Sequence, residues 1–419
     1  MSLSHIPTEY STAESHTNGA AAANFISVAS FTWILCFISF ASLLFVSLSQ
    51  TLAVFVFLVA SALPVLFLPT RALRALFGDW LPWLFVALVI LSISWSDEPE
   101  LTTKYAIELA LTVAAALILA GVVEPHSLLS AVMVAFLAAD VAGLFVGRFA
   151  MNAGAMAMIG IFGSKNAFSA VQAYLFLASF WVLLSAKHSI WMRSLALMSV
   201  LVCPLLLVAG RSADAVAPLV VVIPITFLLF LTNRWPPLSR ILVILAGIFL
   251  VILIFGTAFA FRDTLFGQLL IITGKDVTLS GRDYLWLRAG ALINQNPLLG
   301  TGYGAFWVQG NPYAEEIWAH FQNTGRGGFN FHNQWYDMVI AVGYVGLSVA
   351  LFIVLIVNIR TVWWIVRNPS AESYFFFGFI WMLNMRSFLE TENFALFSTS
   401  WMLFVAASYY ARVNKRLRS

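Results

Sequence analysis

Long apolar stretches alternate with short polar segments along most of the chain. The apolar stretches are continuous and do not alternate residue by residue, which favours helices over half-buried strands. A helix needs ~20 mostly apolar residues to cross a bilayer, and by that rule the sequence predicts about twelve spans. They are expected near residues 25–48, 51–69, 79–96, 101–122, 126–147, 166–186, 190–210, 213–232, 239–261, 333–358, 372–389 and 392–411.

The segments between and outside these spans complete the predicted organisation. Residues 1–24 are polar and contain no Lys or Arg, so they are interpreted as a disordered cytoplasmic tail rather than a signal peptide. Spans one to nine occupy residues 25–261, and spans ten to twelve occupy residues 333–411. The long loop between them, residues 262–332, carries a predicted short amphipathic helix at 280–297. Residues 412–419 form a basic tail.

Composition strengthens this prediction of an all-α polytopic membrane protein. Of the 419 residues, 61% are hydrophobic and only 10% are charged, whereas a soluble domain has about 25% charged residues. Helices satisfy their own backbone hydrogen bonds inside lipid. Cys36 and Cys203 fall in predicted spans, with no disulfide framework or zinc-site spacing. The net charge of +3 and the absence of a basic patch outside the cytoplasmic loops give no indication of nucleic-acid binding.

Lys and Arg residues in the loops predict the orientation, because cytoplasmic loops carry an excess of them. Alternate loops contain Arg71, Lys187, Arg234 and Arg360, and the C-terminal tail is also basic. The opposite loops SDEPE (96–100) and LETEN (389–393) are acidic. Both termini are therefore expected in the cytoplasm, and residues 262–332 outside. Three cations are predicted on the outer side against this trend: Arg148, Lys165 and Arg211.

Charged residues inside predicted spans are costly and usually mark function. Most of them are expected in the outer halves of their spans, with few in the inner halves. They are Lys104, Glu108, Asp140, Asp214, Asp337, Arg386 and Glu390. This distribution predicts a single polar cavity that opens to the outer side.

Three motifs follow one another in order: AGRSADA (209–215), SGRDYLWLRAGALINQNPLLGTGYGAFW (280–307) and HNQWYDMVIAVGYVGL (332–347). FGSKNAF (162–168) precedes them. The glycines of LLGTGYG do not match G-x-G-x-x-G, so no nucleotide site is expected there. In this order and topology, over residues 150–350, the motifs resemble the O-antigen ligase and polysaccharide polymerase family.

The resemblance implies a glycosyltransferase of the bacterial inner membrane whose active site faces the periplasm. Its donor would be a glycan on undecaprenyl pyrophosphate, and its acceptor a glycan hydroxyl at the bilayer surface. Chain-length and export proteins of the polysaccharide pathway are possible partners, and neither a cofactor nor a metal is expected.

The same resemblance suggests roles for individual residues. Arg211 and Arg282 would stabilise the charge that develops on the departing pyrophosphate, because guanidinium binds phosphate oxygens in a bidentate manner. His332 would be the general base, since histidine titrates near pH ~6.5. The sequence leaves open whether Asp337, one helical turn away, orients the His332 ring. The substrate-binding residues would be Lys165, Asn166, Arg288, Asn333, Asp337, Arg386 and Glu390.

Several alternatives remain open at this stage. The stretch NPLLGTGYGAFW favours a member that polymerises exopolysaccharide units, but an O-antigen ligase acting on lipid A–core shares the motifs. A polysaccharide or lipid transporter is the alternative from another class, although no repeat between the two halves supports it. A metal site could also be drawn from Glu315, Glu316, His320 and His332. Only Glu316 and His320 have helical i, i+4 spacing, and no third ligand follows at a fixed spacing.

Overall fold

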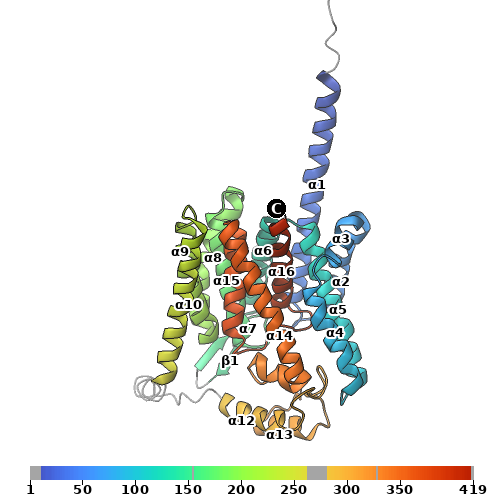
Figure 1. Ribbon diagram of the computed structural model, residues 1–419, viewed down its shortest axis with the longest axis vertical. Helices are drawn as coiled ribbons and strands as arrows, with labels where there is room; N and C mark the ends of the chain where they lie inside the picture. Colours follow the sequence, from blue (N-terminus) through green and yellow to red (C-terminus); the bar gives the residue numbers. More distant parts are fainter. Residues whose placement is uncertain (1–10, 153–154, 262–280, 327–328, 417–419) are drawn as a thin grey trace, which may run out of the picture.

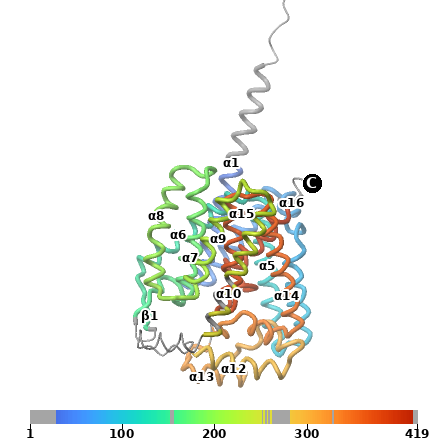
Figure 2. The backbone as a smooth tube through the Cα atoms, turned by 60° about the vertical axis from the view of Figure 1, so that its left-hand side comes forward, coloured from blue at the N-terminus to red at the C-terminus, as the bar shows by residue number. Residues whose placement is uncertain are grey.

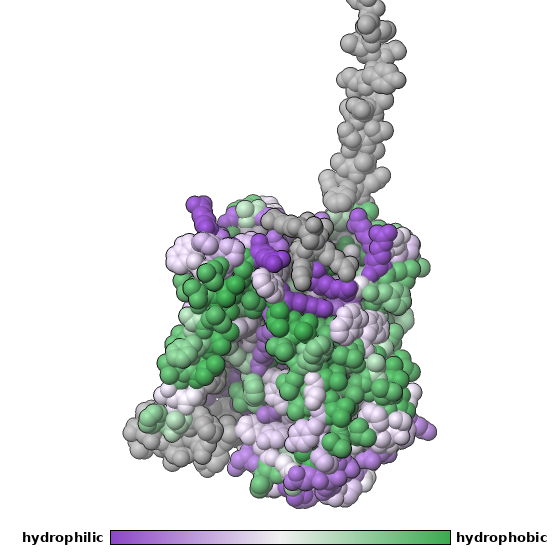
Figure 3. Space-filling model, viewed as in Figure 1, coloured by the Kyte–Doolittle hydropathy of each residue, from purple (hydrophilic) through white to green (hydrophobic). Residues whose placement is uncertain are grey.

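The protein is an all-α membrane protein, described here from a computed structural model that covers residues 11–152, 155–261, 281–326 and 329–416. Long helices run side by side in one bundle, and two short helices, α12 (Arg282–Ile293) and α13 (Pro312–His320), lie across one end. The C-terminus lies at the opposite end (Figure 1). On the face that Figure 3 shows, hydrophobic residues cover the middle of the bundle and hydrophilic residues gather at both ends.

Every stretch predicted as a span coincides with a helix. The helices are α1 (Ser11–Leu44), α2 (Gln50–Phe67), α4 (Leu81–Ser92) with η1 (Ile93–Trp95), α5 (Pro99–Val122), α6 (Pro125–Val146), α7 (Lys165–Leu184), α8 (Ile190–Gly210), α9 (Ala213–Leu231), α10 (Pro237–Ala260), α14 (Gln334–Arg367), α15 (Ala371–Arg386) and α16 (Thr399–Arg416). Helix α1 includes residues 11–24, which the sequence assigned to a disordered tail.

The predicted number of twelve spans is not confirmed by helix length and apolarity. Among the described residues, seven helices are long and apolar enough to cross a membrane. The number becomes eight if α3 (Pro69–Leu76) and the helix after it, which are bent by 64° relative to each other, count as one span. Helix α15 has only 16 residues, and the described apolar part of α1 is Val28–Leu44. The chain is therefore a multi-pass membrane protein, and helix length and apolarity alone do not fix the number of its spans.

An unpredicted β-hairpin connects α6 to α7 at the end where α12 lies (Figures 1 and 2). Strands β1 (Phe149–Asn152) and β2 (Ala155–Met158) pair antiparallel. The Arg148 guanidinium donates from Nε to the Gly160 carbonyl at 2.8 Å and from Nη2 to the Phe162 carbonyl at 3.3 Å. Arg148 thus fixes the turn that leads into α7, where the Ser164 hydroxyl accepts from the Ala167 N–H.

Helix α14 is broken inside its apolar stretch, and the glycine-rich loop after α12 fills the break. Val342 and Gly343 have non-helical backbone angles, which frees carbonyl and N–H groups on both sides. The loop 297–302 pairs with these groups: Thr301 and Gly302 N–H donate to the Ile340 and Ala341 carbonyls, each at 2.9 Å, and Tyr344 N–H donates to the Pro297 carbonyl at 2.8 Å. These bonds satisfy backbone groups that would be costly to leave unpaired away from water.

The segment outside the bundle packs as a cap with an apolar core of its own. Leu285 and Ala289 of α12 and Ile317 and Trp318 of α13 are buried against Phe331, which directly precedes His332. A helix was expected at 280–297, and α12 occupies Arg282–Ile293 of that range, whereas α13 was not predicted. Because the cap packs on the start of α14, it places α12 beside the His332 segment.

Candidate functional site

Glu390, in the loop after α15, is the centre of a polar cluster at the end of the bundle where the cap lies. Its carboxylate accepts from Arg282 Nη2 at 2.6 Å and from Asn166 Nδ2 at 2.5 Å. The ring nitrogen Nδ1 of His332 lies 3.2 Å from Glu390 Oε2. The Glu390 residue is only 8% exposed. We call these four residues the Glu390 cluster.

The His332 ring is held by its backbone and by this carboxylate. His332 adopts a left-handed backbone with φ of 49°, and its N–H donates to the Asn330 side-chain oxygen at 2.7 Å. A carboxylate only accepts hydrogen bonds, so the imidazole nitrogen facing Glu390 carries the proton. In the neutral form of the ring, Nε2 is then the acceptor, as in histidines that a carboxylate orients.

Arg282 is brought to the cluster by α12. The helix begins after Gly281, whose φ of 83° is left-handed. Trp286, one turn further along, donates from its indole to the Phe331 carbonyl at 3.0 Å. Arg282 and Trp286 therefore share one face of α12 and fix that face against residues 331–332.

A buried chain of hydrogen bonds continues from the cluster into the bundle. Asn166 Oδ1 accepts from the Ser212 hydroxyl at 2.7 Å, and Ser212 also bonds to Asp214. Asp214 Oδ2 pairs with Arg386 Nη1 at 2.8 Å. Arg386, only 1% exposed, also pairs with Glu392, which accepts from the Tyr174 hydroxyl at 2.5 Å. Arg386 thus joins α15 to α9 from the interior, where buried charges need such partners.

Two cations lie beside this chain of contacts. Arg211 ends α8 with a left-handed φ of 52° and directly precedes Ser212. Its side chain is exposed and pairs with none of the described residues. Lys165, half-buried, is the first residue of α7 and directly precedes Asn166. Arg211 is therefore available to an anionic group, whereas Arg282 already has a carboxylate partner.

Three residues assigned to substrate binding make other contacts. Arg288 pairs with Glu316 on α13. The Asn333 side chain accepts from the Trp335 N–H at 3.0 Å and caps α14. Asp337 accepts from the Thr391 hydroxyl at 2.5 Å and from the Phe331 N–H at 3.2 Å. The carboxylate facing the His332 ring is thus Glu390, not Asp337.

The residues of the alternative metal site, and some of the charges expected in one outer cavity, make separate contacts in the structure. Glu315 pairs with Arg326, and His320 stacks on Tyr284, so the proposed metal ligands do not converge, and the described residues contain no group of three such ligands. Among the charges expected in one cavity, Asp140 instead accepts from Gln172 at 2.6 Å. Lys104 lies beside Glu108 at 4.0 Å.

Ser212, Glu392 and Tyr174 were not predicted from the sequence. Ser212 directly follows the candidate Arg211, and this adjacency was the only feature of the sequence that pointed to Ser212 as part of the site. Glu392 lies in LETEN, which was interpreted only as an acidic outer loop. Tyr174 resembles an ordinary aromatic residue in an apolar stretch, and nothing in the sequence relates it to Glu392.

A pocket of about 510 Å³ is lined in part by Asn330 and Thr391, which are close in the chain to His332 and Glu390, and we call it the aromatic pocket. Its lining includes the aromatic rings of Tyr105, Tyr303, Phe306, Trp307, Phe329 and Phe394, and the polar side chains of Asn330, Gln334, Asp337 and Thr391. Burial raises the pKa of Tyr303, so its hydroxyl stays protonated and donates to the Phe394 carbonyl at 2.6 Å. The pocket thus combines ring faces with a few fixed polar groups, as ligand sites do.

Comparison with known proteins identifies the class of the protein. Residues 197–351 match the family model described as O-antigen ligase. This range extends from α8 into α14 and contains Arg211, Arg282 and His332. Residues 197–351 are therefore similar to the O-antigen ligase family. Asn166 and Glu390, which complete the cluster, lie outside the matched range.

A particular relative narrows this class. Over 344 residues the chain is 28% identical to the exopolysaccharide production protein ExoQ of Rhizobium meliloti (strain 1021). The match covers 79% of this chain and 76% of that protein. Together the two matches support a role in joining or polymerising polysaccharide.

Proposed function

We propose that the protein is an inner-membrane glycosyltransferase that polymerises oligosaccharide units carried on undecaprenyl pyrophosphate. The reaction would take place on the periplasmic face during exopolysaccharide biosynthesis, alongside chain-length and export proteins. The observation that carries the proposal is the Glu390 cluster, which joins an oriented histidine to an arginine at the end of the bundle. The relation to ExoQ supports exopolysaccharide as the product.

In this reaction the acceptor hydroxyl attacks the anomeric carbon of the donor glycan. The new carbon–oxygen bond forms as the bond from that carbon to the pyrophosphate oxygen breaks. His332 Nε2 takes the hydroxyl proton, and Glu390 stabilises the imidazolium that forms, because its carboxylate lies 3.2 Å from Nδ1. Undecaprenyl pyrophosphate leaves with the bonding electron pair.

The negative charge on the leaving group requires cations already in position. Arg211 is exposed and unpaired among the described residues, so its guanidinium can bind two phosphate oxygens at once. Arg282 can approach the same group while keeping its bond to Glu390. Lys165, which directly precedes Asn166 of the cluster, adds a further positive charge.

One alternative has an observation of its own. The family model is described as O-antigen ligase, so the acceptor could be lipid A–core rather than a growing polymer. Supplying the reconstituted protein with each acceptor separates the two, because a polymerase extends a glycan without any lipid A–core present. A transporter would be distinguished in detergent, where there are no compartments and only an enzyme gives a product.

The test is turnover of purified protein with its lipid-linked oligosaccharide. We expect His332→Gln to lower turnover by roughly 10²–10⁴-fold, the usual contribution of a general base, while donor binding stays nearly intact. The matched control is His320→Gln, because His320 is exposed on the same outer segment and stacks on Tyr284. It should keep wild-type turnover. Activity of His332→Gln within a few-fold of wild type would rule out the base, and no product from wild type in detergent would rule out the enzyme.

A further inference from the structure

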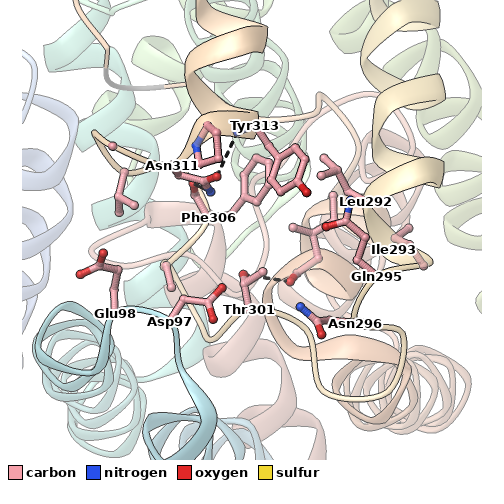
Figure 4. A pocket seen from close by; sticks show the side chains of 15 residues that line it. Asp97, Glu98, Leu292, Ile293, Gln295, Asn296, Thr301, Phe306, Asn311 and Tyr313 are labelled. Carbon is pink, nitrogen blue, oxygen red and sulfur yellow. Dashed lines mark hydrogen bonds between the residues drawn. The ribbon is translucent and has the colours of Figure 1, made fainter.

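Two further pockets lie at opposite ends of the bundle, and their linings differ in charge. The pocket of about 300 Å³ in Figure 4 lies where the turn after η1 meets the cap, and the charged residues that line it are the carboxylates Asp97 and Glu98. The other pocket, of about 480 Å³, is lined by charged residues of both signs. It lies at the end away from the cap, where Tyr410 near the end of α16 donates to the Val123 carbonyl at 2.7 Å.

This second pocket is built from three connections between helices, and we call it the three-loop pocket. Glu124 and His126 come from the connection of α5 to α6, Lys187 from that of α7 to α8, and Arg367 from that of α14 to α15. Glu372, in the first turn of α15, is buried and accepts from the Lys187 ammonium at 3.0 Å. This ion pair fixes two of the three walls relative to each other.

The cations of the three-loop pocket have donors to spare. Arg367 is exposed, and its guanidinium lies over the Trp363 ring at 4.7 Å without a carboxylate partner among the described residues. Stacking uses the face of the guanidinium and leaves its N–H edge free, which suits two phosphate oxygens at once. The Lys187 ammonium has further N–H donors besides the one that Glu372 accepts. Together the two side chains can bind one phosphate group.

The carboxylates of the lining complement a positive group. The Glu124 side chain is 66% exposed and lies 3.3 Å from His126 Nδ1, so its carboxylate keeps lone pairs that can accept from a primary ammonium. The two cations of the lining, Lys187 and Arg367, are matched by two carboxylates. This balance of charge favours a zwitterionic ligand over a purely anionic one.

Exposed tryptophans place the three-loop pocket at the level of lipid head groups. Trp363 is 46% exposed and directly precedes Trp364, which lines the pocket. Trp191 is 80% exposed and lies in the first turn of α8, just after the Lys187 connection. Exposed tryptophan rings gather at the boundary between the bilayer and water. The ligand with the readiest access to this pocket is therefore a phospholipid.

We propose that the three-loop pocket binds the head group of an aminophospholipid, with the phosphate on Arg367 and Lys187 and the primary ammonium on Glu124. This site is separate from the Glu390 cluster and does not depend on the proposed function. A bound head group would hold the near ends of α7 and α15 together, because Lys187 follows α7 and pairs with Glu372 of α15. It should therefore also raise the unfolding temperature of the protein.

The experiment measures the affinity of single lipids for the full-length protein in detergent by native mass spectrometry. Phosphatidylethanolamine, phosphatidylcholine and phosphatidylglycerol with the same acyl chains are compared. The wild type should bind phosphatidylethanolamine about tenfold more tightly than phosphatidylcholine, whose methylated ammonium has no N–H to donate. Phosphatidylglycerol, which has no amine, should also bind more weakly.

Two variants separate the two halves of the head group. Glu124→Gln should lose the discrimination between phosphatidylethanolamine and phosphatidylcholine, whereas Arg367→Gln should weaken the binding of both about tenfold. Arg71→Gln is the matched control, because Arg71 is an exposed arginine on α3 at the same end of the bundle and outside the lining. It should bind all three lipids as the wild type does.

Free phosphoethanolamine carries the same phosphate and ammonium, so it tests the source of the head group. It should compete only at far higher concentration than the lipid, and equal affinity would assign the pocket to a soluble ligand and overturn the lipid. The proposal is also wrong if the wild type binds phosphatidylethanolamine and phosphatidylcholine equally, prefers phosphatidylglycerol, or binds no better than a folded Arg367→Gln variant. None of these measurements uses turnover, so failure of the proposed glycosyl transfer would leave their result unchanged.

Discussion

Glu390 is shared by an imidazole, a guanidinium and an amide, and this sharing determines how each of them can act. With His332 Nδ1 at 3.2 Å and Arg282 Nη2 at 2.6 Å, the carboxylate fixes the ring and keeps the cation beside it. In the proposed reaction Glu390 acts through His332 and Arg282, which it contacts, so we assign it a positioning role. Its effect should therefore appear in turnover more than in substrate affinity.

We predict that Glu390→Gln lowers kcat by about 10²-fold, the upper end of what loss of an orienting partner costs, and changes KM for the donor far less. The amide keeps the size of the side chain but cannot accept from three donors with a negative charge. Steady-state kinetics on reconstituted protein measures both constants. Glu108→Gln is the control, since Glu108 pairs with Lys104 and bonds to none of the four residues of the Glu390 cluster. A rise in KM with unchanged kcat would contradict the positioning role.

Arg211→Lys and Arg282→Lys test the cations. Lysine keeps the charge but loses the planar pair of donors, so each variant should lose about 10²–10³-fold in kcat while still accumulating in the membrane. Arg282→Lys should also disturb His332, because both contact Glu390, whereas Arg211→Lys should not. The yield and length of the polymer made by each reconstituted variant test these expected losses. Near-normal polymer from both variants would mean that neither arginine stabilises the leaving group.

At this scale the sequence predicted the members of the site better than their contacts. His332, Arg282, Asn166 and Glu390 were all selected, each from its own motif or from its charge in an apolar stretch. Their convergence on one carboxylate was not predictable, because Glu390 is 58 residues beyond His332 and its acidic loop was fully explained by topology. The orienting role was instead considered for Asp337, which is close in sequence.

The broken helix α14 and the glycine-rich loop after α12 form the element that holds the cap on the bundle. The loop donates to carbonyls before the break and accepts from N–H groups after it. Gly343, with φ of 66°, lies against the backbone of Leu298 so closely that a Cβ atom would collide with the Leu298 carbonyl. Glycine is required here both for the left-handed backbone and for the close approach.

We predict that Gly343→Ala separates the loop from α14 and abolishes transfer, because the cap then no longer holds Arg282 at the cluster. Gly290→Ala is the matched control. Gly290 lies within α12, and a Cβ atom there meets nothing within 4 Å, so alanine should stabilise the helix by up to about 1 kcal/mol. Thermal unfolding in detergent and polymer synthesis test both variants. Full activity of Gly343→Ala would show that the break is not needed.

Helices were predicted correctly where apolarity alone determines the structure. The prediction failed where hydrogen bonds between distant backbone segments determine it. The stretch MVIAVGYVGL is apolar throughout, so it predicts an unbroken span, and only the partner loop reveals the break at Val342 and Gly343. The hairpin at 149–158 was missed because it falls in the short interval between two strong helical stretches.

The two ends of the bundle are both tied by buried ion pairs, but they differ in chemistry. At the end opposite the cap, Asp79 is fully buried and accepts from Arg360 Nη1 at 2.8 Å and from the Ser408 hydroxyl at 2.5 Å. The sequence predicted few such charges on the inner side: Arg360 was assigned to a loop, and Asp79, the first residue of the predicted span 79–96, was not singled out. This group fixes α14 and α16 against the start of α4, whereas the Glu390 cluster lies under the cap.

The orientation of these ends in the membrane can be tested with single cysteines. The Lys and Arg pattern predicts that the cap faces the periplasm, so Thr324→Cys in the exposed outer segment should react with a membrane-impermeant thiol reagent in intact cells. Ser239→Cys, near the start of α10 at the other end, should react only after the membrane is opened. The natural residues Cys36 and Cys203 are buried, so the background should be low. Labelling of Ser239→Cys but not of Thr324→Cys in intact cells would invert the topology and place the Glu390 cluster in the cytoplasm. A periplasmic transferase would then be excluded, whatever the kinetics of the purified protein.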